Sequence, residues 1–76
     1  MKYTPSEHLA EAHRQVADLR LQIAEQKQLI ATLAHHGQAT AEAEDLLRML
    51  EKSLGTGEHH LKLLSDALPK EELENG

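Results

Sequence analysis

The sequence predicts an all-α fold: an antiparallel two-helix hairpin, or short coiled coil, that dimerises into a four-helix bundle. Three observations predict it. Apolar residues recur every seven positions through two long segments, as coiled coils require. A turn, His36-Gly37-Gln38-Ala39-Thr40, separates these segments. The only aromatic residue among the 76 is one tyrosine, so the core must be built from aliphatic side chains, which suits helices packed on helices.

The first helix is expected over about residues 5–36. Thr4 and Glu7 form a capping box at its start, with Pro5 at the first helical position. The repeat places Leu9, Val16, Ile23 and Ile30 at heptad position a, and Ala12, Leu19, Gln26 and Leu33 at position d. Gln26 is the polar member, and it either sets the register or is an amide tolerated near the bundle edge. Gly37 is expected to end the helix in a left-handed C-terminal cap.

The second helix is expected over about residues 41–68, with turn residues 37–40 before it and Thr40 as its N-cap. Its repeat places Leu47, Leu54, Leu61 and Leu68 at a, and Ala43, Leu50, Gly57 and Leu64 at d. Gly55 and Gly57 weaken the middle of this helix. The heptad phase nevertheless runs through them, so a continuous helix is the favoured interpretation and a break at 55–57 the alternative. Residues 69–76 are expected to form a frayed acidic tail.

Charged residues at heptad position e support an antiparallel pairing. The first helix offers His13, Arg20 and Lys27 at e, and the second offers Glu44, Glu51, Glu58 and Ser65. Because e faces e in an antiparallel coiled coil, basic side chains meet acidic ones. The expected register sets Arg20 beside Glu58 and Lys27 beside Glu51.

The same register predicts which core residues oppose one another. Gln26 lies level with Leu54, and Ile23 is received by the space left at Gly57. The whole chain, residues 1–76, is thus expected to be a single hairpin.

Apolar surface remains after the hairpin has closed. The second helix carries a second stripe, spaced by threes and fours: Leu46, Met49, Ser53, Thr56, His60, Leu63 and Ala67. The first helix has alanine at every b position: Ala10, Ala17, Ala24 and Ala31. The alanines either admit another backbone closely or simply favour helix on a solvent face. Both surfaces are candidate interfaces, for a homodimer or for a helical protein partner, and the pattern leaves open which helix forms the dimer contact.

The stretch from about His8 to Leu64 carries a turn signature, Gly-x-x-Thr-x-x-Ala-Glu-x-Leu-Leu, from Gly37 to Leu47. With it come the segments 8–12, 23–26 and 29–31, residue Leu54 and the pair 60–61. In these residues the chain resembles a group of small helical-hairpin proteins of alphaproteobacteria that have no assigned activity. The resemblance implies a short helical hairpin and adds nothing on chemistry.

Composition excludes several classes of function. A net charge of −5 argues against binding to nucleic acid or to anionic membrane surfaces, because both need a basic face. No run of about 18 apolar residues is present to span a bilayer, and no signal peptide is recognisable at the start. We therefore expect a cytoplasmic protein. Cysteine is absent, so no disulfide or thiolate site supplements a small core, and oligomerisation is the remaining source of stability.

No residue pattern predicts catalysis. The six histidines include two adjacent pairs, 35–36 and 59–60, which point to different faces of a helix, and no His-x-x-x-His spacing exists to chelate a metal. We expect no metal, no cofactor and no enzymatic activity, and interpret the chain as a structural or protein–protein interaction module. The alternative is a small histidine phosphotransfer or signalling domain, with His59 as the phosphoacceptor and Lys62 three residues later.

Overall fold

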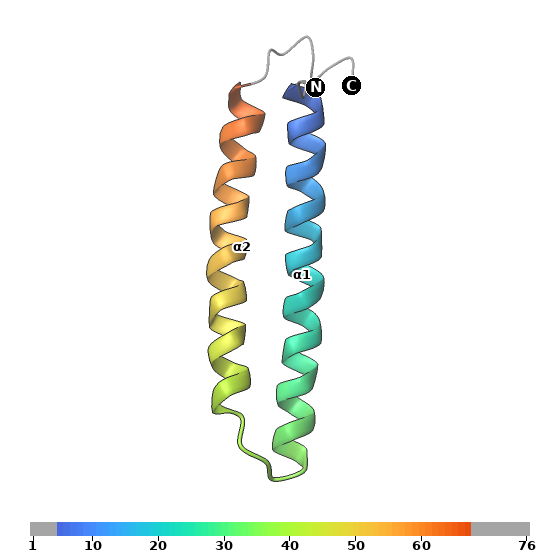
Figure 1. Ribbon diagram of the computed structural model, residues 1–76, viewed down its shortest axis with the longest axis vertical. Coiled ribbons are helices and arrows are strands. Elements are labelled where there is room, and N and C mark those ends of the chain that lie inside the picture. The colour runs from blue at the N-terminus through green and yellow to red at the C-terminus, as the bar shows by residue number, and fades with distance from the viewer. Residues whose placement is uncertain (1–4, 68–76) are drawn as a thin grey trace.

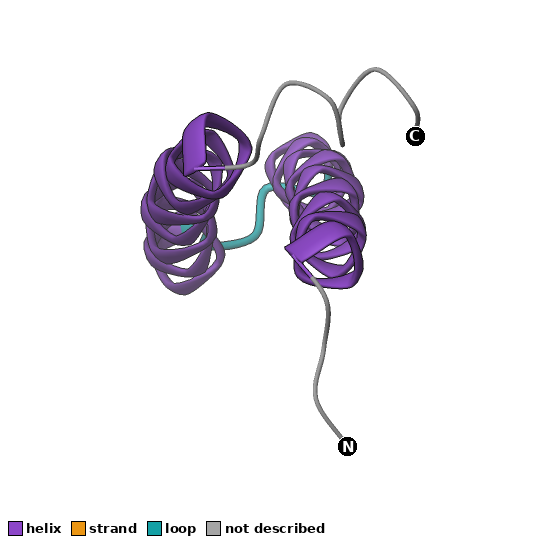
Figure 2. Ribbon diagram, turned by 90° about the horizontal axis from the view of Figure 1, so that it is seen from above, coloured by secondary structure: helices purple, strands orange, loops and turns teal. Residues whose placement is uncertain are grey.

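The computed structural model is a hairpin of two long helices, and it describes residues 5–67. Helix α1 comprises Pro5–His35 and helix α2 comprises Ala41–Ala67. The two run antiparallel, so that the start of α1 and the end of α2 lie at the same end of the molecule (Figure 1). Seen from above, they stand side by side, joined by one loop at the far end (Figure 2). The predicted two-helix, all-α fold is confirmed for the described residues.

The buried seam follows the predicted heptads. Every a and d position from Leu9 to Leu64 is buried or half-buried in the described residues. Among the described residues, only Ala12, Val16 and Ile23 are buried, with 6%, 2% and 7% of their surface exposed, and all three belong to the N-terminal two thirds of α1. The other seam residues are only half-buried, because each helix covers one side of its neighbour and leaves much of its circumference in solvent. Two helices alone therefore form a seam rather than an enclosed core.

Helix α1 ends in a Schellman motif built on Gly37. The N–H of Gln38 donates to the carbonyl of Leu33 at 2.8 Å, and the N–H of Gly37 donates to the carbonyl of Ala34 at 3.0 Å. Gly37 has a φ of 69°, the left-handed conformation that this motif requires and that glycine adopts without steric cost. The predicted C-terminal cap is confirmed.

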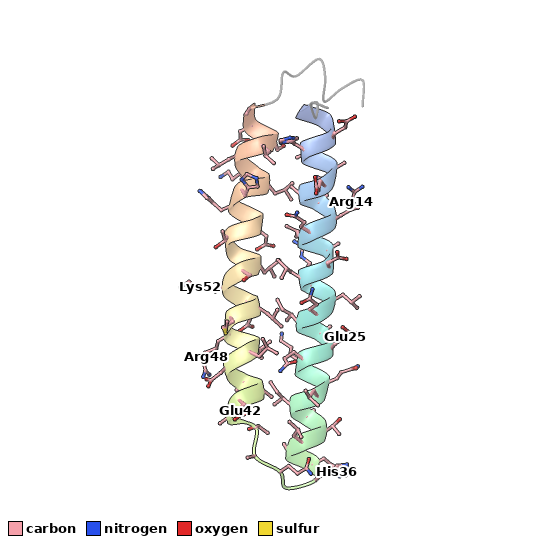
Figure 3. The ribbon with its side chains drawn as sticks, viewed as in Figure 1. Arg14, Glu25, His36, Glu42, Arg48 and Lys52 are labelled. Carbon is pink, nitrogen blue, oxygen red and sulfur yellow. The ribbon has the colours of Figure 1, made fainter. Side chains whose placement is uncertain are left out.

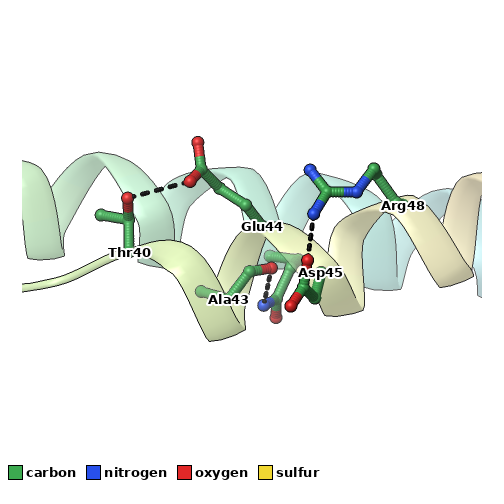
Figure 4. Close-up of polar contacts among 6 residues, drawn as sticks. Thr40, Ala43, Glu44, Asp45 and Arg48 are labelled. Carbon is green, nitrogen blue, oxygen red and sulfur yellow. Dashed lines mark hydrogen bonds and ion pairs between the residues drawn. The ribbon is translucent and has the colours of Figure 1, made fainter.

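Helix α2 begins after Thr40, whose carbonyl accepts the first helical hydrogen bond from the N–H of Glu44 at 2.8 Å. The Thr40 hydroxyl donates to the Glu44 carboxylate at 3.1 Å (Figure 4). The helix then continues without interruption through Gly55 and Gly57, as the unbroken heptad phase predicts. The capping box expected at Thr4, the core position at Leu68 and the acidic tail 69–76 lie outside the described residues.

The predicted register of the hairpin is wrong by one heptad. A Cβ placed on Gly57 would lie 3.4 Å from Val16 Cγ2 and 3.9 Å from Leu19 Cδ1, so Gly57 faces these residues and not Ile23. In agreement, the side chain of Gln26 reaches the Ala43 carbonyl, with Nε2 to O at 2.9 Å. The predicted opposite of Gln26, Leu54, lies eleven residues farther along α2, about 16 Å at 1.5 Å per residue.

The connection between the helices accounts for this shift. After Gly37 the chain returns alongside α1 through residues 38–40 before α2 begins (Figure 1). Three extended residues span about 10 Å, which is also the rise of about seven helical residues. A return segment of this length moves α2 by one heptad relative to the predicted register and leaves the same heptad positions in the seam.

Candidate interaction surface

The hairpin has two flanks of different character. Core positions a and d lie between e on one side and g on the other, so in an antiparallel pair e faces e along one flank and g faces g along the opposite flank. Positions b of both helices extend the first flank, and positions c extend the second. We call them the charged flank, which carries e and b, and the uncharged flank, which carries g of both helices and c of α2.

The charged flank contains the one predicted ion pair that forms between the helices. Arg20 Nη2 lies 2.8 Å from Glu58 Oε2, with the two side chains 61% and 46% exposed. The second predicted pair, Lys27 with Glu51, is not among the ion pairs of the described residues. Exposed pairs gain only about 0–1 kcal/mol, so a long lysine side chain loses little by remaining solvated.

The alanine row also lies on the charged flank. Ala10, Ala17, Ala24 and Ala31 are all exposed, and their b positions adjoin the e positions that carry Arg20. The two candidate interfaces predicted from the sequence are therefore on opposite sides of the hairpin. A single partner helix cannot contact both at once.

The uncharged flank carries the exposed apolar stripe of α2. Leu46, Met49 and Leu63 are 45%, 66% and 54% exposed, and the intervening stripe residues Ser53, Thr56, His60 and Ala67 are exposed as well. No Asp, Glu, Lys or Arg occupies a g position from residue 15 to 67 in either helix. Charged side chains such as Arg48 and Lys52 on α2 project elsewhere on the helix surface (Figure 3), and Arg48 pairs with Asp45 on its own helix (Figure 4).

A small hollow shows that the g rows of the two helices adjoin. It has a volume of about 100 Å³ and is lined by His8, Glu11, Ala12, Gln15, His60 and Leu64. Gln15 and His60 are g residues of α1 and α2, and Ala12 and Leu64 form the seam beneath them. Glu11, at position c, brings a carboxylate to the α1 edge of the same flank.

Carboxylates continue along that α1 edge. Asp18 and Glu25 follow Glu11 at intervals of seven residues, which places all three on one line of the α1 surface. The α1 side of the uncharged flank is thus bordered by a row of acidic residues, which we call the acidic row. The α2 side has Met49, Thr56 and Leu63 in the equivalent position, with one carboxylate, Glu42, in the first turn of α2.

One residue of this surface was not predicted from the sequence. Leu29 is 46% exposed and occupies a g position of α1, on the same flank as Leu46. A signal for it existed, because Leu29 is the one apolar residue among the α1 positions 15, 22, 29 and 36. Four of the five large apolar side chains exposed in the described residues therefore lie on the uncharged flank: Leu29, Leu46, Met49 and Leu63. The fifth, Leu21, faces outward from α1.

Two of the histidines, His8 and His60, line the same hollow, but the histidines form no larger cluster within the described residues. His35 and His36 pack edge to face, with ring centroids 5.5 Å apart, at the end of α1. Within residues 5–67, no group of three or more His, Asp or Glu side chains is arranged to hold a metal ion. His59 is exposed on the outer side of α2, and the hypothesis that it accepts a phosphoryl group stays a prediction.

Comparisons with known proteins do not place the chain in a family. No protein-family model matches the chain, and neither a curated protein nor a solved structure shows significant similarity to it. The resemblance to small helical-hairpin proteins of alphaproteobacteria therefore remains an expectation. Among the described residues, neither helix combines the length and apolar character needed to cross a membrane.

Proposed function

We propose that this protein is a non-enzymatic interaction module that self-associates through its amphipathic helices, as a homodimer of hairpins forming a four-helix assembly. The observation that carries the proposal is the distribution of exposed apolar side chains. Leu29, Leu46, Met49 and Leu63 share one flank, and that flank has no charged residue at its g positions. Charge is depleted at the centre of protein interfaces in the same way.

The poor core of the single hairpin supports self-association. Three buried side chains in the described residues are few for a folded unit, and neither a disulfide nor a metal cluster supplements them there. Small domains of this kind obtain the missing burial from a partner. A second copy is always present at the same concentration as the first and supplies an identical apolar stripe.

The test is the solution mass of the purified chain, measured by light scattering from low to high micromolar concentration, together with helicity by circular dichroism. The chain mass is 8.5 kDa, so a dimer doubles it. We expect a highly helical species whose mass approaches the dimer value as concentration rises. A helical protein that remains monomeric throughout the series would overturn the proposal.

A further inference from the structure

The apolar stripe of α2 is nearly symmetric about its own centre. Its residues are spaced by threes and fours, so they form a single line that a supercoiled partner helix can follow. Between Leu46 and Leu63 a leucine stands at each end and the hydroxyl residues Ser53 and Thr56 stand in the middle. Met49 and His60 are the one unlike pair of this portion, and Ala67 lies beyond it. Read in either direction, the line presents apolar ends and a small polar centre.

An antiparallel α2-to-α2 contact uses this symmetry. With the two stripes aligned about the centre, Leu46 lies level with the partner's Leu63, and Ser53 lies level with the partner's Thr56. Every contact then occurs twice, related by a two-fold axis, as in an isologous dimer. In this arrangement four of the six stripe residues from Leu46 to Leu63 meet a residue of their own kind on the partner, two leucines and two hydroxyl residues. This match favours a second copy as the occupant.

The acidic row excludes the other pairings on this flank. If α1 packed against the partner's α1 in the same face-to-face arrangement, Asp18 would approach its own copy and Glu11 would approach the partner's Glu25. Like charges brought together across an interface are destabilising. If α1 packed against the partner's α2 instead, the same carboxylates would be desolvated against Met49 and Leu63, which is costly without a counter-charge. The α2-to-α2 contact keeps the acidic row of α1 out of the interface and brings one carboxylate, that of Glu42, to each of its ends.

We propose that a second copy of this chain covers the α2 stripe through an antiparallel α2-to-α2 contact, with its two-fold axis beside residues 54–55 and the two α1 helices held apart on the outside by their acidic rows. The proposal rests on the self-association proposed above and adds its geometry. It assigns the dimer contact to α2 and leaves the alanine row of α1 in solvent.

The absence of cysteine allows a test by single-cysteine cross-linking of the full chain. Ser53→Cys and Thr56→Cys replace exposed residues in the middle of the stripe, and Ala24→Cys, in the alanine row, is the matched control on the opposite flank. Circular dichroism first verifies that each variant retains wild-type helicity. Each is then oxidised alone, and the two stripe variants are also oxidised as an equal mixture.

We expect disulfide-linked dimer in the mixture to form at least several-fold faster than in either stripe variant alone, because the axis sets position 53 of one copy level with position 56 of the other. Ala24→Cys should remain monomeric on the same time scale. If the wild-type chain is dimeric by light scattering but only Ala24→Cys cross-links, the α2 geometry is wrong while self-association stands. If the wild-type chain is a monomer at every concentration, both proposals fail.

Discussion

Alanine substitutions at the two glycines of α2 test the packing of the hairpin most directly. Each mid-helix glycine costs about 1 kcal/mol relative to alanine. Gly55 is exposed and a Cβ there meets nothing within 4 Å, so Gly55→Ala should raise the free energy of unfolding by about 1 kcal/mol. A gain of that size raises the melting temperature of so small a domain by roughly 4–8 °C.

Gly57→Ala should stabilise somewhat more. Its new methyl group would contact Val16 Cγ2 at 3.4 Å and Leu19 Cδ1 at 3.9 Å, which is ordinary van der Waals separation. A fully buried methylene contributes about 0.8 kcal/mol, and Gly57 is half-buried, so about half of that adds to the gain in helix propensity. The expected total is about 1–1.5 kcal/mol.

The assay is urea unfolding followed by circular dichroism, with all variants at one chain concentration because the stability of a self-associating protein depends on it. Gly37→Ala is the control of opposite sign: at a φ of 69° an alanine is strained by about 1–2 kcal/mol, so this variant should be less stable than the wild type. If Gly57→Ala lowers stability while Gly55→Ala raises it, the helices approach more closely at Val16 than the structure shows. If Gly55→Ala gives no gain, α2 is not helical at that point.

Three further predictions address the seam and the flanks. Arg20→Glu should lower the free energy of unfolding, and with it the melting temperature, at low salt by about 0–1 kcal/mol. The difference from the wild type should disappear at high salt. Lys27→Glu should have a smaller effect, and equal effects of the two substitutions would show that the Arg20 ion pair does not form in solution. Gln26→Leu should raise the free energy of unfolding because a polar residue in a coiled-coil seam costs stability, and a loss would show that its hydrogen bond to α2 outweighs that cost. If the proposed dimer forms, Leu63→Lys should convert it to a helical monomer by light scattering. Leu21→Lys, at a similarly exposed leucine on the outer face, should leave the mass unchanged. The same response from both variants would remove the uncharged flank as the interface.

Much of the hairpin could be predicted because the relevant physics is local. The seven-residue repeat determines which side chains enter the seam, and every described a and d position is indeed buried or half-buried. Gly37 is the residue type that a Schellman cap requires, so the end of α1 was visible in the sequence. The continuity of α2 through Gly55 and Gly57 followed from the unbroken phase between Leu54 and Leu61.

The register could not be predicted in the same way, because a heptad pattern repeats. Sliding α2 by seven residues returns every a and d residue to a seam position. The charges do not resolve the ambiguity either: Arg20 lies close to Glu58 in both registers, since each e residue of an antiparallel pair lies between two e residues of its partner. The length of the return through residues 38–40 decides the matter, and it depends on the conformation of the loop after Gly37.

The candidate interface was predicted in part for a related reason. A stripe on one helix is visible in the periodicity of that helix alone, which is why Leu46, Met49 and Leu63 could be named. The combination of two helices into one flank is a tertiary property, so the separation of the alanine row from the stripe, and the addition of Leu29 to it, required the structure.

The location of the exposed leucines, rather than their number, makes them informative. Single exposed apolar residues are common on protein surfaces and need no partner. Here the opposite flank, which carries Arg20 and Glu58, exposes no large apolar side chain within the described residues, while the uncharged flank exposes Leu29, Leu46, Met49 and Leu63. A hairpin selected only to remain monomeric gains nothing from this asymmetry, because charges on both flanks would orient the helices equally well. The proposed pairing with a second copy uses one flank to orient the helices, and on the other flank it uses the α2 stripe, which lies away from the acidic row of α1.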